Sequence, residues 1–186
     1  LVHPIIPTNK MKLDLRELPF YYINLEDATE RKEKVEEILK GLDIKNVTRI
    51  NAIKHENGAA GTPRSMLKAL ELAHNGDPFV LLEDDISLKN WDPVIEIPDD
   101  TDALYLGVSW WGRMNSHSGP CVKWEKVNDK ILRVYNMLGG HAILYKSDRY
   151  IDLSKRICQH AGYKIHDHVD IGFATVQRWH NIYAID

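Results

Sequence analysis

The stretch Phe79-Val-Leu-Leu-Glu-Asp-Asp85 holds four apolar residues that are followed at once by three carboxylates. A short run that is apolar at every position is typical of a buried strand in an α/β sheet. Ligands of open α/β sheets bind beyond the carboxyl ends of the strands. The stretch therefore predicts a buried strand over 79–82 and a ligand site at the acidic residues that follow it.

Two strand–helix pairs are expected before this stretch. Residues 20–25 are aromatic and β-branched and predict a first strand, nearly all of it apolar, as in a strand buried on both faces. Asp27, with Glu30 three residues later, resembles a capping box at the start of a helix. Residues 47–52 predict a second strand, and Thr62-Pro63 predicts the N-cap and first turn of a second helix.

The rest of the chain predicts a different pattern, with a hairpin among its strands. We expect strands over 102–110, 141–145 and 181–185, a polar loop over 113–120, a hairpin over 122–135, and helices over 148–160 and 167–178. Alternating strands and helices favour an α/β fold with a mostly parallel sheet, helices on both faces and an antiparallel hairpin insertion. We expect a single domain over 18–186, preceded by an N-terminal extension or linker over 1–17.

Length and composition limit the classes of function. The chain has 186 residues, enough for one domain with a core of its own, and 44% hydrophobic residues, which is ordinary for a soluble globular protein. A formal net charge of -3 gives no basic field to attract nucleic acid. The two cysteines lack CxxC spacing, and no stretch approaches a membrane span. These features predict a cytoplasmic protein with reduced thiols, no nucleic-acid partner and no membrane span.

The acidic cluster Glu83-Asp84-Asp85 is the strongest chemical signal in the sequence. Adjacent carboxylates repel one another and stay ionised only if a cation or hydrogen-bond donors offset their charge. Mg²⁺ and Mn²⁺ take oxygen ligands and commonly share them with diphosphate oxygens. The cluster therefore fits a metal–diphosphate site, although a solvated acidic turn would leave the same pattern.

A second candidate is the segment His166-Asp167-His168-Val169-Asp170, which His180 follows ten residues later. A carboxylate here could act as general base on an acceptor hydroxyl, and a histidine could complete a metal shell. The alternative is a helix cap made by Asp167, with histidines on the surface.

Three weaker signals complete the candidates. The glycines Gly139 and Gly140 precede a strand and would let the backbone approach a donor sugar or an acceptor. Trp110-Trp111 could form an aromatic platform for a sugar ring, although tryptophan is equally common in cores and interfaces. Arg31, in the first turn of the first helix, could meet a phosphate group.

The order of these motifs resembles that of the family 25 glycosyltransferases, the lipopolysaccharide and collagen galactosyltransferase-like group. The resemblance covers residues 18–186 and includes small virus-encoded enzymes of similar length. The motifs that carry it are Tyr22-Ile-Asn-Leu25 with Arg31, Asn51-Ala52, Gly61 to Ser65, Leu82-Glu-Asp-Asp85, Leu104-Tyr-Leu-Gly107 and Gly139-Gly-His-Ala-Ile-Leu-Tyr-Lys-Ser147.

The resemblance implies a GT-A fold, in which a Rossmann-like nucleotide-binding half and an acceptor half share one domain. It also implies an inverting, metal-dependent transfer of a hexose from a nucleoside-diphosphate sugar, most often UDP-linked. The acceptor would be a hydroxyl of a glycan or a protein-linked hydroxyl, as in a glycoprotein, and the cofactor would be Mn²⁺ or Mg²⁺.

Roles for single residues follow from the same resemblance. Tyr22, Asn24 and Arg31 would surround the nucleotide, and Ser65 would lie near the ribose. Glu83, Asp84 and Asp85 stand where the family's acidic metal motif stands. Asp85 and Glu83 are expected as metal ligands. Asp84 and Gly140 are expected to lie beside the donor. His180 would be the third protein ligand of the metal. Asp170 or Asp167 would be the base.

Two other functions compete with this interpretation. A nucleotidyltransferase would also join a Rossmann-like sheet to a metal–diphosphate site, but it favours a glycine-rich, basic loop after the first strand. Here residues 26–30 are acidic and contain no glycine. A non-catalytic module that binds nucleotide sugars or carbohydrates on the same fold is the other alternative, and slow hydrolysis of the donor would separate a catalyst from such a binder.

Overall fold

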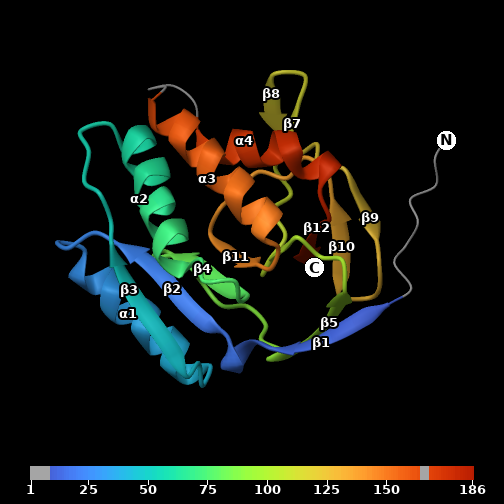
Figure 1. Cartoon of the computed structure of the whole chain (residues 1–186), viewed down its shortest axis with the longest axis horizontal. Helices are drawn as coiled ribbons and strands as arrows, with labels where there is room; N and C mark the ends of the chain where they lie inside the picture. The colour runs from blue at the N-terminus through green and yellow to red at the C-terminus, as the bar shows by residue number, and fades with distance from the viewer. Residues whose placement is uncertain (1–8, 164–167) are drawn as a thin grey trace.

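A mixed eight-stranded sheet forms the centre of the molecule in a computed structural model that describes residues 9–163 and 168–186 (Figure 1). Its strand order is β3-β2-β4-β11-β6-β12-β10-β9. These strands are β2 (Pro19–Asn24), β3 (Asn46–Asn51), β4 (Phe79–Glu83), β6 (Ala103–Tyr105), β9 (Trp124–Lys126), β10 (Ile131–Val134), β11 (Ala142–Tyr145) and β12 (Ile182–Ile185).

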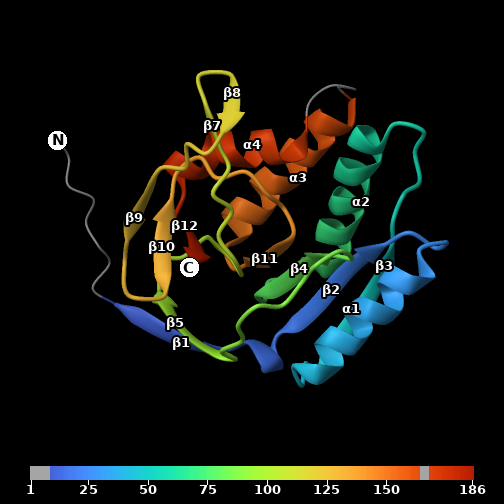
Figure 2. The ribbon, with the colours of Figure 1, turned by 180° about the vertical axis from the view of Figure 1, so that it is seen from behind.

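Four α-helices and two short ribbons surround this sheet in the described residues (Figure 2). The helices are α1 (Thr29–Gly41), α2 (Gly58–Ala73), α3 (Asp148–Tyr163) and α4 (Val169–Val176), with 3-10 helices η1 (Leu15–Glu17) and η2 (Gln177–Trp179). The ribbons pair β1 (Lys10–Asp14) with β5 (Val94–Pro98), and β7 (Gly112–Met114) with β8 (His117–Gly119). The chain is therefore an α/β protein, as the alternating pattern predicts.

The expectation of a mostly parallel sheet is wrong. Strand β2 runs parallel to β3 and β4, and β6 runs parallel to β12. Strand β11 lies antiparallel between β4 and β6, and β10 is antiparallel to both β12 and β9. A buried strand is apolar whichever way it runs, so the pattern of β11 could not reveal its direction. The expected hairpin is confirmed as β9 and β10.

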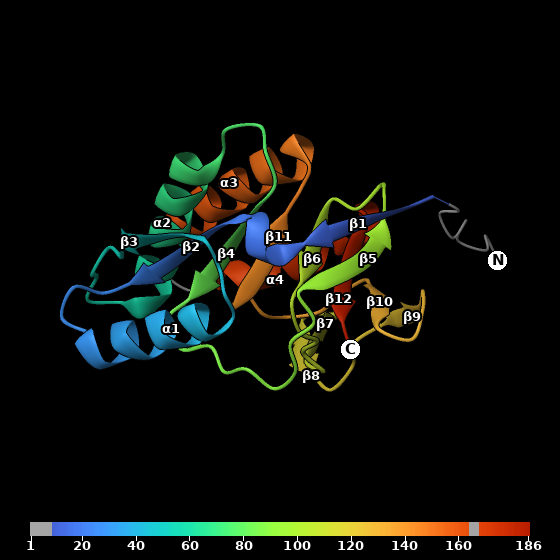
Figure 3. The same ribbon diagram turned by 90° about the horizontal axis from the view of Figure 1, so that it is seen from below.

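Helices cover both faces of the sheet, as expected. One core joins β2, β4 and β11 to the apolar sides of α2, α3 and α4 through residues such as Leu70, Tyr150 and Phe173. The other face packs on Val35 and Leu39 of α1 and on the β1–β5 ribbon. Figure 3 shows α1 and the α2–α3 pair on opposite sides of β2 and β4.

Several expected boundaries need correction. Residues 10–17 are no separate extension, because β1 pairs with β5 and Leu15 is fully buried in the core. Asp27 does not cap α1, whose N-cap is Ala28, since the Asp27 carboxylate pairs with Lys54 at 2.5 Å. Helix α2 begins before Thr62-Pro63, where the carbonyl of Asn57 accepts the N–H groups of the first turn.

The central and C-terminal elements also differ from expectation at their ends. The strand expected over 102–110 is only three residues long, and the polar loop over 113–120 contains the β7–β8 hairpin. The last helix ends at Val176 and continues as the 3-10 turn η2. These differences shorten the expected elements but leave their order along the chain unchanged.

Replacing Gly172 with alanine is expected to destabilise the protein, because α3 and α4 pack too closely there for a side chain. A Cβ at Gly172 would lie 2.5 Å from Cγ2 of Ile157, well inside contact distance. A helical Gly→Ala change normally gains about 1 kcal/mol, but overpacking costs about 1–3 kcal/mol. We therefore expect Gly172→Ala to lower the free energy of unfolding in urea by up to about 2 kcal/mol.

The matched control is Gly41→Ala in α1, where a Cβ would meet nothing within 4 Å. This variant should be as stable as the wild type or more stable by up to about 1 kcal/mol. If Gly172→Ala were as stable as Gly41→Ala, the inference that α3 and α4 pack too closely for a side chain at position 172 would be wrong.

Candidate functional site

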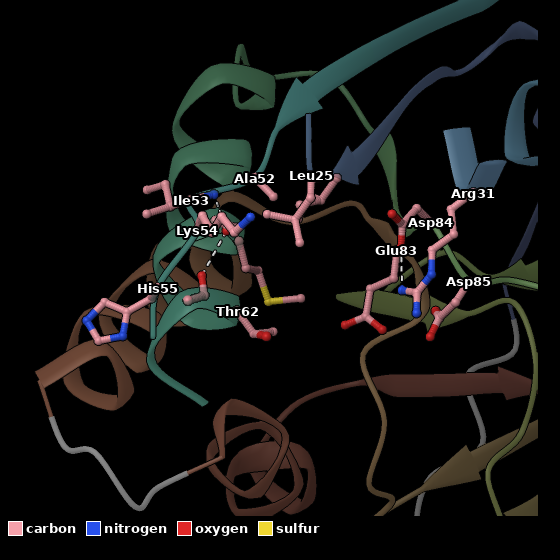
Figure 4. A pocket seen from close by; sticks show the side chains of 14 residues that line it. Leu25, Arg31, Ala52, Ile53, Lys54, His55, Thr62, Glu83, Asp84 and Asp85 are labelled. Carbon is pink, nitrogen blue, oxygen red and sulfur yellow. Dashed lines mark hydrogen bonds and ion pairs between the residues drawn. The ribbon is translucent and has the colours of Figure 1, made fainter. Parts of the chain in front are cut away.

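A cleft of about 390 Å³ opens at the carboxyl ends of three parallel strands, β2, β3 and β4. Its walls come from Leu25 after β2, from the segment after β3 that contains Lys54, and from the acidic cluster Glu83-Asp84-Asp85 at the end of β4. Met66 and Ser65 of α2 also line the cleft. Figure 4 shows Leu25, Lys54 and Glu83 around it. The structure thus places the acidic cluster in a cleft at the sheet edge where ligands of α/β proteins bind.

Asp84 is the anchored carboxylate of the cluster. Its side chain is 12% exposed, and its Oδ2 accepts a hydrogen bond of 2.7 Å from Nδ2 of Asn24. Arg31 of α1 approaches Oδ1 at 3.3 Å from the solvent side of the cleft. Because both oxygens have a partner, the charge of Asp84 is offset within the protein.

Asn24 connects three segments around the cleft. It is buried, with 1% of its surface exposed, at the last position of β2. Its Nδ2 also donates to the carbonyl of Ala28 at 3.1 Å, and its Oδ1 accepts from Nε of Arg49 on β3 at 3.0 Å. The single amide therefore fixes the turn into α1, the end of β3 and the carboxylate of Asp84.

Glu83 faces the start of β11 across the sheet. Its backbone N–H donates to the carbonyl of His141 at 2.8 Å, and its Oε2 lies 3.4 Å from Nδ1 of His141. A Cβ on Gly140 would lie 3.7 Å from Oε1 of Glu83, so the glycine backbone borders the same carboxylate. The pair is thus built on two adjacent antiparallel strands.

His141 interacts with several nearby carboxylates. The hydrogen bond with Glu83 raises the pKa of His141 above its ordinary value, partial burial opposes this, and the charges of Glu83, Asp85 and Asp170 add to the rise. Asp170 lies in the first turn of α4, and Asp85 is exposed at the mouth of the cleft. Three carboxylates, two from the end of β4 and one from α4, therefore act on one imidazole.

Two of the expected site residues lie away from the cleft. Tyr22 belongs to the core under α1, where its hydroxyl donates to Oε1 of Glu36 at 2.5 Å and burial raises its pKa. Tyr22 therefore does not line the cleft, because its side chain points to the opposite face of the sheet from that of Ile23, which does.

His180 is the second of these residues. Its Nδ1 lies 3.5 Å from Oδ2 of Asp102, just before β6. Strands β4 and β6 run in the same direction, both antiparallel to β11, and Phe79 and Ala103 pair with the same residue, Tyr145. Measured along the direction of the strands, Glu83 therefore lies about 17 Å from Asp102. His180 is not placed to share a metal ion with the acidic cluster.

Ser65 lines the cleft, but its hydroxyl already has two partners. It donates to the carbonyl of Gly61 at 2.8 Å and accepts from the N–H of Ile53 at 2.8 Å. These bonds tie the segment after β3 to α2, so Ser65 shapes the cleft wall. Asp167, the other expected base, lies outside the described residues.

Several residues at the site were not predicted. Lys54 and His55 lie in the cleft wall directly after β3, Arg49 holds Asn24, and His141 meets Glu83. The position of Lys54 and His55 after a strand end is the same signal that indicated Glu83-Asp84-Asp85. The role of Arg49 depends on the pairing of β3 with β2. The sequence pattern of a single segment does not reveal which strand it pairs with.

The donor atoms fit a hard divalent cation shared with a diphosphate. Among residues 9–163 and 168–186, no three His, Cys, Asp or Glu side chains are placed to hold one metal ion. Magnesium sites on phosphates, however, commonly use only one or two carboxylates, and water and phosphate oxygens complete the shell. Glu83 and Asp85 offer two carboxylates at one cleft, and His141 lies beside Glu83.

Comparison with known proteins leaves the family open. No model of a known protein family matches the sequence, and no curated protein matches it. The resemblance to family 25 glycosyltransferases therefore stays a prediction that depends on the motifs alone. In the part of the chain that the structure describes, no helix is long and apolar enough to cross a membrane.

Proposed function

We propose that the chain is a glycosyltransferase that binds a nucleoside-diphosphate sugar, UDP-linked, in the cleft at the ends of β2, β3 and β4. The observation that carries the proposal is the acidic cluster at the end of β4 in an open cleft that Arg31 and Lys54 also border. A diphosphate needs positive charge, and these two cations and a metal ion on Glu83 and Asp85 would supply it.

The proposed transfer is a single displacement with inversion. Asp170 accepts the proton of the acceptor hydroxyl as that oxygen attacks the anomeric carbon of the hexose, and the bond to the diphosphate oxygen breaks. A bound Mn²⁺ or Mg²⁺ supplies stabilisation of the negative charge that develops on the leaving diphosphate. Arg31, held beside Asp84, adds positive charge on the same side.

Family 25 and the GT-A fold are part of the same proposal. The parallel strands β3, β2 and β4 with α1 and α2 are compatible with a Rossmann-like half, and the mixed strands from β11 to β9 are compatible with an acceptor half. Glu83 and Gly140, which the resemblance assigns to the donor site, lie side by side. The order of the sequence motifs supports the family.

Binding of UDP and UDP-sugars, measured by calorimetry with Mn²⁺ and with EDTA, tests the proposal. We expect metal-dependent binding to the wild type and at least a tenfold weaker affinity for Asp85→Ala, since a lost charged ligand costs about 1.5–3 kcal/mol. Asp77→Ala, which removes an exposed carboxylate outside the cleft, is the matched control and should bind as the wild type does.

Absence of nucleotide binding under both conditions would overturn the proposal. Nucleotide binding without hydrolysis of any UDP-sugar would instead favour the non-catalytic binding module. Slow release of free hexose from one UDP-sugar would identify both the activity and the donor, because water then takes the place of the acceptor hydroxyl.

A further inference from the structure

A second cavity, of about 230 Å³, lies near the β9 edge of the central sheet. It is lined by Met114 of β7, Lys123 just before β9, Tyr135 and Asn136 just after β10, and Arg178 of η2. Strands β9 and β10 end the strand order that begins with β3 and β2, and Figure 1 shows them on the far side of the ribbon from α1. The cavity shares no described lining residue with the cleft at the ends of β2, β3 and β4, so it is a separate candidate for a ligand.

The side chain of Asn136 fixes the backbone around this cavity. It is 2% exposed, and its Nδ2 donates to the carbonyls of Arg113 and Cys121 at 3.0 and 3.1 Å. Its Oδ1 accepts the N–H of Lys123 at 2.6 Å. One buried amide therefore holds both ends of the β7–β8 hairpin and the start of β9 against the end of β10.

Lys123 and Tyr135 lie opposite each other where the β9–β10 ladder ends. The N–H of Tyr135 donates to the carbonyl of Lys123 at 3.0 Å, which continues the antiparallel register that pairs Trp124 with Val134. Side chains of directly opposite residues point to the same face of a sheet. The side chains of Lys123 and Tyr135 therefore share one face, and that of Trp124 points to the other.

The charge around the cavity is positive. Among the residues that the structure describes, its lining includes two cations and no carboxylate. Neither Lys123 nor Arg178 has an ion pair or a side-chain hydrogen bond within residues 9–163 and 168–186. Arg133 adds a third cation, with its Cζ 5.5 Å from the centroid of the Tyr135 ring. Glu125, on the neighbouring strand, is already occupied, because it accepts the Tyr135 hydroxyl at 2.8 Å.

We propose that this cavity, the cationic cavity, binds a small molecule that joins one phosphate or carboxylate group to a ring of about monosaccharide size. The side chains of Lys123 and Arg178 donate charged hydrogen bonds, which both kinds of anionic group accept. Met114 and the ring of Tyr135 offer apolar contacts to the rest of the ligand. The proposal does not depend on the transferase function proposed above.

The size of the cavity limits the ligand. Pockets for drug-sized molecules commonly enclose about 300–1,000 Å³, so a cavity of about 230 Å³ suits a smaller one. A single-stranded nucleic acid needs a positively charged groove that follows its backbone over several nucleotides. Two unpaired cations in one cavity, on a chain with a net charge of -3, instead fit a single anionic group.

Calorimetric titration of the full chain with glucose 6-phosphate, glucuronate and glucose tests the proposal. We expect at least one of the two acids to bind at least tenfold more tightly than glucose. The phosphate and carboxylate arms show which anionic group the cavity prefers. The titrations are made in about 0.15 M salt, where exposed charges more than about 8 Å apart are largely screened.

Variants locate the binding to the cationic cavity. Lys123→Gln/Arg178→Gln should weaken binding of the preferred acid about tenfold, and both residues are exposed, so the fold should be kept. The control Lys89→Gln/Arg156→Gln removes the same charge from two exposed positions outside the cavity and should bind as the wild type does. Both double variants should keep the UDP affinity of the wild type.

The proposal would be overturned if neither acid bound more tightly than glucose. An equal loss of affinity in the two double variants would also overturn it, because net charge alone would then account for the binding. Displacement of the acid by UDP would place it in the cleft instead and reject the cationic cavity as its site. Acid binding by a protein that binds no UDP would support the cavity and reject only the proposed transferase function.

Discussion

Asp102→Ala is expected to lower the free energy of unfolding by about 3 kcal/mol at neutral pH, because the carboxylate holds three elements together. It is 2% exposed, and Oδ1 accepts the Ser147 hydroxyl at 2.5 Å. Its Oδ2 accepts from Arg149 at 2.7 Å and from the N–H of Asn181 at 2.8 Å. Alanine just before β6 leaves these donors at the starts of α3 and β12 without an acceptor.

The contribution of Asp102 should also depend on pH. Burial raises the pKa of its carboxyl, but the bonds from Ser147, Asn181 and Arg149 outweigh burial and hold the pKa below its ordinary value. A carboxyl with a depressed folded-state pKa stabilises the protein above about pH 4 and loses this contribution as the pH falls through the folded-state pKa. Asp102→Asn should therefore differ most from the wild type near pH 7.

Urea unfolding at pH 7 and at pH 3 measures this effect. The difference between wild type and Asp102→Asn should shrink at pH 3, and Asp102→Ala should remain the least stable at pH 7. Asp99→Ala is the control, because Asp99 is exposed and its carboxylate has no hydrogen bond or ion pair within the described residues. A loss from Asp102→Ala no larger than that from Asp99→Ala would contradict the network.

The part of the fold that was predictable depends on signals within one segment. Strands β2 and β4 are apolar runs that end in polar residues, so their existence, their ends and the acidic cluster beyond β4 follow from the sequence. The carboxyl ends of parallel strands meet at one edge, which is why the cleft lies where the pattern placed it. Residues 20–25 and 79–85 therefore carry most of the successful prediction.

What could not be predicted depends on contacts between distant segments. Strand β1 pairs with β5, in a register that joins Lys10 to Pro98, and no local pattern indicates this partner. The direction of β11 decides whether its start meets Glu83, and that direction comes from its two neighbours. His180 was expected at the metal because of the family resemblance, but the structure places it beside Asp102, at the opposite end of the strands from Glu83.

Asn24→Asp is the second variant with a large expected effect. The ionised carboxylate of Asp102 stabilises the protein, whereas a new ionised carboxylate at position 24 should destabilise it. The change keeps the shape of the side chain but places a carboxylate oxygen 2.7 Å from Oδ2 of Asp84, where the amide nitrogen now donates. Two adjacent carboxylates cannot both ionise without a large cost, although Arg49 and Arg31 offset part of the charge. We expect a loss of about 3 kcal/mol at pH 7.

Protonation of one of the two carboxyls should relieve this loss. The folded state raises a pKa of the pair above its value in the unfolded chain, so the destabilisation is present at neutral pH and fades towards pH 4. Urea unfolding at pH 7 and pH 4 checks the trend, with Asn46→Asp at the exposed start of β3 as control. Because Asn24 also positions Asp84 and the turn before Arg31, UDP affinity should fall at pH 7 in Asn24→Asp and not in Asn46→Asp. An Asn24→Asp variant as stable as Asn46→Asp at pH 7 would show that the amide of Asn24 does not hold Asp84 in place. The description of Asp84 as the anchored carboxylate of the cleft would then be wrong.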